Sequence, residues 1–219
     1  VTAPDGRKWK AVSDGSLGDR TTSAEVVTPI LKYEDMETLQ AVVRALRKAG
    51  AQTPSCTSQH VHIGVTDFTA RQIANFARIW YKQEAVILKA LGTLPSRLAH
   101  YTRPTDPNPA HYDGARYRAI NLNNVWRTGT VEIRAFNGTT HAGEVKAHIL
   151  LALAIAAKAL TAKCASTKNP QEFNEATAKY TMRVFTLHLG MIGEEFKNTR
   201  MHLLKHLEGS TAWKNGRPE

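Results

Sequence analysis

The sequence predicts an α+β protein, with strands gathered in the first part of the chain and helices dominating the second. Short segments in which apolar and polar residues alternate, the pattern of half-buried strands, all lie before residue 137. After that point apolar residues recur at helical spacing and turn signals are few. Strands and helices that occupy separate parts of a chain are typical of α+β proteins.

The individual elements follow from these patterns and from the turn residues between them. Strands are expected at residues 8–12, 25–28, 59–65, 119–122 and 130–136. Helices are expected at 33–49, 69–91, 143–163, 170–180, 181–189 and 194–206. Residues 94–114, rich in Pro, Asp and Asn, are expected to be an irregular loop, and residues 127–129 to close a hairpin between the last two strands.

The net charge of the chain indicates which chemical class of partner it attracts. The chain has 219 residues, a formal net charge of +10 and a sequence pI near 9.8. Such a surface attracts anions, among them nucleotides, nucleic acid and acidic peptides. Because the basic residues are scattered, the charge alone does not identify nucleic acid as the partner, although it leaves nucleic acid among the candidates.

Cysteine content and hydropathy indicate in which cellular compartment the protein is expected. Cys56 and Cys164 are the two cysteines in the sequence, so neither a disulfide framework nor a cysteine-based metal site is expected. The longest apolar run, 149–160, is too short to span a bilayer and contains Lys158. The sequence therefore predicts a cytoplasmic protein without membrane contact.

Two segments concentrate the residues that can carry chemistry. His60 and His62 flank one apolar residue, and so do Glu132 and Arg134, so on strands each pair points to one face. If the two strands are neighbours, two imidazoles, a carboxylate and a guanidinium share one surface, a set that can bind a divalent metal and a phosphate. Internal pairing of Glu132 with Arg134, or a solvent-facing edge, remains the alternative.

Five segments, taken in order, resemble the putative amidoligase family of the glutamine synthetase / glutamate–cysteine ligase superfamily. They are residues 9–17, 25–29, 60–64, 116–122 and 130–139. The resemblance implies a curved antiparallel β-sheet, with helices on its outer face and ATP and Mg²⁺ or Mn²⁺ on its concave face. It also implies ATP-dependent joining of a carboxylate to an amine through an acyl phosphate. On this basis residues 1–165 are expected to form an amidoligase-like catalytic domain, and 166–219 a helical C-terminal extension of it.

The resemblance also implies roles for individual residues. His60, Glu132 and Glu25 match metal ligands of the superfamily, and Glu132 and Arg134 belong to its catalytic strand. His62 matches a histidine that faces the nucleotide phosphates, while Arg134 matches the arginine that holds the transferring phosphate.

Three further residues lie in the matching motifs. Ser16 belongs to the family's Asp-Gly-Ser turn, and Asn121 to its Arg-Tyr-x-x-x-Asn segment, so both are expected near the nucleotide. Arg116 opens that second segment and is expected to contact the substrate or the phosphate during catalysis. Asn121, Asn123, Asn124 and Asn137 are also candidates to supply amide groups to a substrate.

The family pattern includes a Glu-x-Glu strand upstream of the first matched segment, which this sequence does not contain. We therefore expect either that this strand is absent or that another chain supplies it. A homo-oligomer is a separate expectation. The expected substrates are a small-molecule or peptide carboxylate and an amine. Two other readings stay open: a metal-dependent hydrolase built on the His-x-His pair, and a non-catalytic or partner-completed basic interaction protein.

Overall fold

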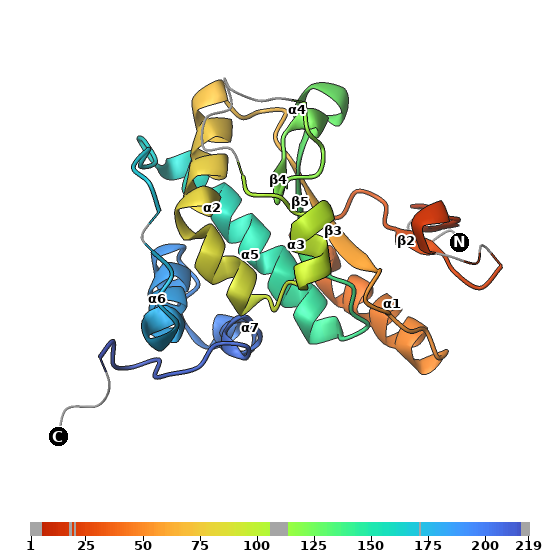
Figure 1. The fold of residues 1–219 in the computed structure, drawn as a ribbon. Helices are drawn as coiled ribbons and strands as arrows, with labels where there is room; N and C mark the ends of the chain where they lie inside the picture. The colour runs from red at the N-terminus through yellow and green to blue at the C-terminus, as the bar shows by residue number, and fades with distance from the viewer. Residues whose placement is uncertain (1–5, 18, 20, 106–113, 171, 216–219) are drawn as a thin grey trace.

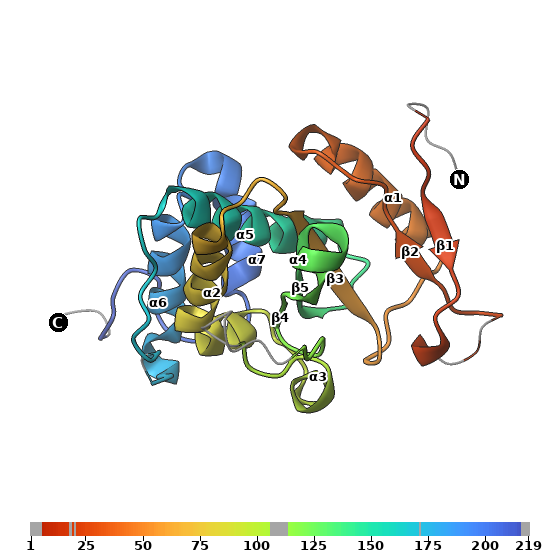
Figure 2. The same ribbon diagram turned by 90° about the horizontal axis from the view of Figure 1, so that it is seen from above.

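The computed structural model describes residues 6–17, 19, 21–105, 114–170 and 172–215, which form helices and two small antiparallel sheets (Figure 1). The α+β class is therefore confirmed. The N-terminal β-hairpin lies at one end of the molecule and the C-terminal segment at the other, as both views show (Figures 1 and 2).

The larger sheet has the strand order β3-β5-β4 and contains the residues that the sequence singled out. β3 (Ser58–Gly64) and β4 (Ile120–Asn121) both pair antiparallel with the central β5 (Thr130–Asn137). β1 (Lys10–Val12) and β2 (Glu25–Val27) form a separate two-stranded sheet. The described strands thus make two small sheets rather than the one curved sheet that the family resemblance implied, because β1 and β2 pair only with each other.

The β3–β5 pair has an apolar face and a polar face, as the alternation predicts. Val61 lies opposite Ile133, and both are buried in the hydrophobic core. The next residues along, His62 and Glu132, lie opposite each other and point to the other face. The hydrophobic core therefore covers one side of this sheet, and the ionisable residues occupy the other side.

β5 contains a β-bulge in the middle of the polar segment. Arg134 and Ala135 together lie opposite a single residue of β3, His60. A bulge interrupts the regular ladder, so the main-chain groups at that point need other partners.

The helices pack around α5 (Ala142–Thr161), whose sequence is almost entirely apolar. α5 contacts α2 (Ala70–Ala90), α1 (Met36–Lys48) and α7 (Lys197–Leu204), as well as β3. α6 (Glu175–His188) packs on α2 and α7, so the C-terminal helices form a layer against the side of α5 that is away from α1 (Figures 1 and 2). None of the helices in the described residues is both long and apolar enough to cross a membrane.

The long helices and main strands lie where the sequence places them, within a few residues. At the end of α1, Gly50 adopts a φ of +88° and donates its N–H to the Arg47 carbonyl, as expected of a glycine C-cap. At the start of α2, the Thr69 side chain accepts a hydrogen bond from the Gln72 N–H and completes a capping box.

Four expectations need correction. Residues 94–114 are not uniformly irregular, because Pro95 begins the short helix α3 (Pro95–His100); residues 106–113 lie outside the described part. The link between β4 and β5 is not a simple hairpin but a helical turn, α4 (Asn123–Thr128), closed by Gly129 at a φ of +68°.

The other two corrections concern the C-terminal helices. The predicted helices at 170–180 and 181–189 are the single helix α6, which begins only after Asn174, whose side chain caps it. The last predicted helix, 194–206, is a turn of 3₁₀ helix, η4 (Glu194–Phe196), followed by the shorter α7.

Candidate active site

Glu132 lies at the centre of the polar face and is the most connected residue on it. Its Oε1 atom is 2.6 Å from Arg134 Nη1, 3.2 Å from His60 Nδ1 and 3.8 Å from His62 Nε2. The strand pairing explains this geometry, because His62 is the cross-strand partner of Glu132 and Arg134 is its neighbour on the same face. The structure thus brings together the four residues of the two predicted segments.

The second oxygen of Glu132 is held by two side-chain amides. Asn121, directly opposite on β4, donates from Nδ2 to Oε2 at 2.6 Å, and Asn124 of α4 does so at 3.1 Å. Together with the ion pair to Arg134, these two hydrogen bonds fix the orientation of the carboxylate. Asn124 reaches Glu132 because it lies in α4, the helical turn found in place of the expected hairpin.

The electrostatics of the cluster favour a neutral His60 beside an ionised Glu132. Burial, followed by the positive charge of Arg134, lowers the pKa of His60 to about 4, although Glu132 opposes this shift. For Glu132, burial acts to raise the pKa, but Arg134, His60 and the Asn121 amide outweigh it and hold the pKa below its ordinary value. A neutral imidazole next to a carboxylate is a pair of metal-ligand groups in the protonation state that metals require.

Arg134 lies almost buried between this cluster and an aromatic ring. Its guanidinium carbon is 5.6 Å from the centre of the Tyr117 ring, and Arg116 lies against the same ring at 4.8 Å. Arg134 Nε is buried and has no hydrogen-bond acceptor among the described residues. The ion pair with Glu132 uses Nη1, so the other guanidinium nitrogens take no part in it.

The bulge in β5 is held from behind by residues that sequence reasoning did not select. Arg97 of α3 donates from Nη2 to the Arg134 carbonyl at 2.6 Å, and Thr102 Oγ1 donates to the same oxygen at 3.2 Å. Thr93 Oγ1 donates to the Ala135 carbonyl at 2.8 Å. The groups that leave the ladder at the bulge are thus satisfied by side chains of residues 93–102.

The segment that follows is also anchored. The Thr105 N–H donates to both carboxylate oxygens of Glu84 on α2, at 3.1 and 3.0 Å. Burial raises the pKa of Glu84, although these hydrogen bonds and one from Trp80 oppose the shift. Arg103 forms a single parallel bridge with Arg118, which places this segment beside β4.

The remaining predicted residues lie apart from the cluster. Glu25 is exposed on β2, in the other sheet, and no hydrogen bond or ion pair joins it to Glu132 within the described part of the chain. Ser16 lies in the 3₁₀ turn η1 (Gly15–Leu17), and its side chain is outside the described structure. Arg116 is exposed and reaches the site only through the Tyr117 ring that it shares with Arg134.

Of the four candidate asparagines, two orient Glu132 and two support loops. Asn123 donates to the Gly114 carbonyl, while Asn137 donates to the Gly92 carbonyl and accepts the Leu94 N–H. Arg97 could have been noticed from sequence, because Leu94-Pro95-Ser96 is a usual helix start. Its partner, the Arg134 carbonyl, could not, since a bulge leaves no clear mark in the strand pattern.

The side chains of His60 and Glu132 have the chemistry and spacing to hold one divalent ion. Two ligands at right angles, each about 2.1 Å from an octahedral ion, are about 3 Å apart, close to the 3.2 Å between His60 Nδ1 and Glu132 Oε1. Mg²⁺ and Mn²⁺ commonly take one or two protein ligands and complete their shell with phosphate oxygens and water. No other carboxylate joins the cluster within the described residues, so the site offers ligands for one ion.

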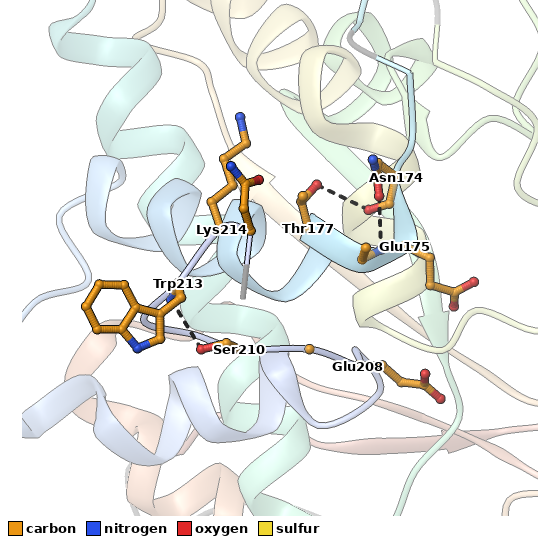
Figure 3. Close-up of a pocket in the computed structure, with 10 residues that line it drawn as sticks. Asn174, Glu175, Thr177, Glu208, Ser210, Trp213 and Lys214 are labelled. Atoms are coloured by element: carbon orange, nitrogen blue, oxygen red, sulfur yellow. Dashed lines mark hydrogen bonds between the residues drawn. The ribbon is translucent and has the colours of Figure 1, made fainter. Parts of the chain in front are cut away.

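Two hollows lie elsewhere on the surface. The larger, of about 670 Å³, lies between the start of α6 and the C-terminal segment (Figure 3). Its hydrogen bonds are local: Thr177 Oγ1 donates to the Asn174 carbonyl and the Trp213 N–H to Ser210 Oγ. None of the predicted site residues lines it. The smaller hollow, of about 220 Å³, lies between α5 and α7.

Comparison with known proteins gives one match. The model of the family described as putative amidoligase enzyme matches residues 1–109 and 108–156, which together cover most of the chain and all of the cluster around Glu132. No curated protein and no solved structure matches.

Proposed function

The chain belongs to the putative amidoligase family, and from this premise we propose that it is an ATP-dependent carboxylate–amine ligase. The single observation that carries the proposal is the arrangement of Glu132, which is held by Arg134 and two amides and faces the partly exposed imidazoles of His60 and His62. Family membership supports the formation of an amide bond. The use of ATP and the course of the reaction are argued from the chemistry of these side chains.

In the proposed reaction the γ-phosphoryl group of ATP moves to a carboxylate oxygen of the first substrate, which gives an acyl phosphate and ADP. The amine nitrogen of the second substrate then attacks the acyl carbon. The carbon–oxygen bond to phosphate breaks, inorganic phosphate leaves, and the nitrogen loses a proton. Phosphoryl transfer of this kind depends on positioning and on charge stabilisation more than on covalent catalysis.

His60 and Glu132 would hold the divalent ion, which would supply positive charge to offset the negative charge of the phosphate groups. Glu132 is already oriented by Asn121, so its free lone pairs point to the surface shared with His60. His62, half-exposed on the same face, lies where it can donate to a phosphate oxygen. Ser16 and Glu25 retain only the roles that the family pattern gives them, as further nucleotide and metal contacts.

Arg134 is proposed to stabilise the phosphoryl group during transfer. Its guanidinium pairs with Glu132 through Nη1, so its positive charge lies beside the position proposed for the ion and the phosphate. Arg97 is buried behind the bulge and adds a second positive charge that His60 senses. Arg116, which is exposed on the other side of Tyr117, is proposed to contact the substrate carboxylate.

The test is titration of the protein with ATP in the presence and absence of Mg²⁺ or Mn²⁺, for wild type and for Glu132→Gln and His60→Ala. We expect metal-dependent binding in the wild type and none in the two variants, with the variants still folded by thermal melting. Hydroxylamine, an amine that converts acyl phosphates to hydroxamates, can then be used to screen candidate carboxylates. Variants that bind ATP as the wild type does would show that the site is elsewhere.

The same titration separates the other two readings. A hydrolase built on His60 and His62 would bind a transition metal without nucleotide. A non-catalytic basic protein would give no ATP response but a salt-sensitive shift with nucleic acid or another polyanion. If a second chain supplies a further strand, then ATP binding would appear only in the assembled form.

A further inference from the structure

A second group of metal-binding side chains lies between α5 and α7, on residues other than those of the cluster around Glu132. We propose that His141, Glu144 and His202 form a binding site for a transition-metal ion of the zinc type. One ligand atom from each of the three lies within 4.8 Å of the others. Within the described residues this is the one place where three histidine, cysteine or acidic side chains converge so closely.

The geometry follows from how the two helices meet. His141 is the N-cap of α5 and Glu144 lies in its first turn, so both project from the same end of the helix. His202 comes from α7, and its ring centre is 5.0 Å from that of His141. Two ligands bound to a tetrahedral zinc at about 2.1 Å are about 3.4 Å apart, so modest side-chain rotation closes the site.

Gly143 allows this approach. A Cβ atom at this position would lie 2.5 Å from His202 Nε2 and 3.1 Å from His141 Cε1. Both rings therefore converge over a backbone position that has no side chain. His141 Nδ1 also accepts the Glu144 N–H at 3.3 Å, a long hydrogen bond whose loss costs little when the ring turns to a metal.

The donor set favours zinc over magnesium. Two imidazoles and one carboxylate are the three protein ligands of several zinc sites, with the fourth position left to water or another ligand. Mg²⁺ prefers oxygen ligands and a larger shell. The site opens into the hollow of about 220 Å³, which gives an ion and its water room to enter.

Glu144 already holds a cation at this place. Its Oε1 forms an ion pair with Lys205 of the α7 C-cap, and its Oε2 accepts a hydrogen bond from Thr139 at 2.8 Å. Thr139 thus orients the carboxylate, while the Lys205 ammonium occupies the position that a metal would compete for. A bound ion would join the start of α5 to α7 more firmly than the lysine does, because it would hold three side chains at once.

The test is zinc titration of chelator-stripped protein against a competing chromophoric chelator. We expect the wild type to bind one zinc ion at this site, and His202→Ala to lose at least about 100-fold in affinity. His60→Ala, in the other cluster, and His188→Ala, an exposed histidine of α6, should leave this affinity unchanged. Lys205→Met should raise it about fivefold, because the competing ammonium is gone.

Gly143→Ala guards against simple misfolding, since alanine favours the helix yet pushes the two imidazoles apart. We expect this variant to melt no lower than the wild type without metal and to lose the zinc-induced rise in melting temperature. The proposal is overturned if the wild type binds no zinc, if His202→Ala binds as the wild type does, or if only His60→Ala abolishes binding. These outcomes are independent of the ATP titration.

Discussion

Arg97 donates a hydrogen bond from Nη2 to the main-chain oxygen of Arg134, 2.6 Å away, so one arginine is held in place by the backbone of another. Arg97 is 4% exposed, and no carboxylate pairs with it within the described residues. Burial and the charge of Arg134 both lower its pKa. A buried guanidinium without a counter-ion costs stability, and here it adds positive potential behind a surface proposed to bind phosphates.

We predict that Arg97→Met separates stability from binding. The variant loses one hydrogen bond, but Thr102 still satisfies the Arg134 carbonyl and an unpaired charge leaves the interior. The free energy of unfolding should therefore change by less than about 1 kcal/mol, or rise, while ATP affinity falls about tenfold. Urea unfolding and ATP titration measure the two effects, with the exposed Arg71→Met as control. A loss of stability above about 3 kcal/mol would mean that Arg97 is mainly structural.

For Arg134 we expect the opposite balance between binding and turnover. Arg134→Ala should lower kcat by about 100-fold or more and change ATP affinity much less, because its donor acts on charge that develops during transfer. Arg134→Lys keeps the charge near Glu132 but not the planar array of donors, and should recover only part of kcat. Steady-state kinetics with a substrate from the hydroxamate screen provide the comparison. Equal losses in affinity and kcat for both variants would contradict this role.

Gly138→Ala should disturb the junction between the two long strands. A Cβ atom there would lie 2.1 Å from Thr57 Oγ1 and 2.7 Å from Thr57 Cβ, and the Gly138 N–H already bonds the Thr57 carbonyl at 3.1 Å. We expect a loss of about 1–3 kcal/mol in the free energy of unfolding, measured in urea. Gly64→Ala is the matched control, since Gly64 ends β3, has no atom within 4 Å of its Cβ position and should change stability by less than about 0.5 kcal/mol.

His148 should make stability depend on pH. Its ring stacks on Phe136 at 4.5 Å and its Nδ1 is 2.8 Å from Gln59 Oε1. Burial, the largest cause, lowers the pKa of His148 to about 4; Glu144 opposes the shift, while Lys205, His202 and His206 add to it. The unfolded chain therefore binds a proton that the folded chain does not, and stability present above pH 6.5 is lost as pH falls towards 4.

This shift corresponds to about 3 kcal/mol at most. Urea unfolding between pH 4 and 7 of wild type and His148→Gln should show a steeper loss in the wild type, since glutamine does not titrate. Parallel curves for the two proteins would assign the pH dependence to other groups, such as His202 and His206, whose pKa values burial also lowers.

Local sequence patterns predict much of this fold because they reflect which face of an element is buried. The alternation in β3 and β5 correctly places His60, His62, Glu132 and Arg134 on one face, and the predicted asparagine on β4 meets them. The long amphipathic and apolar helices were predicted for the same reason. The α+β class and the gathering of these side chains on one face could thus be predicted from residue periods.

What could not be predicted depends on contacts between distant segments. Nothing in residues 93–102 indicates that Arg97 and Thr93 bond the backbone of β5, because their partners are main-chain atoms exposed by a bulge. The turn between β4 and β5 is helical. The Asn123 N–H donates to Asn121 Oδ1 at its start, and Gly129 ends it in the left-handed conformation, and hairpin rules do not anticipate these contacts. The separation of β1 and β2 from the larger sheet is likewise a matter of global arrangement.

The bulge in β5 has a consequence for how such a protein can diversify. Residues 93–102 are hydrogen-bonded to β5 through the carbonyls of Arg134 and Ala135. Every residue has a main-chain carbonyl, so these hydrogen bonds do not depend on which side chains β5 carries at positions 134 and 135. Side chains of β5 can therefore change during evolution without breaking the hydrogen bonds that hold residues 93–102 against the strand.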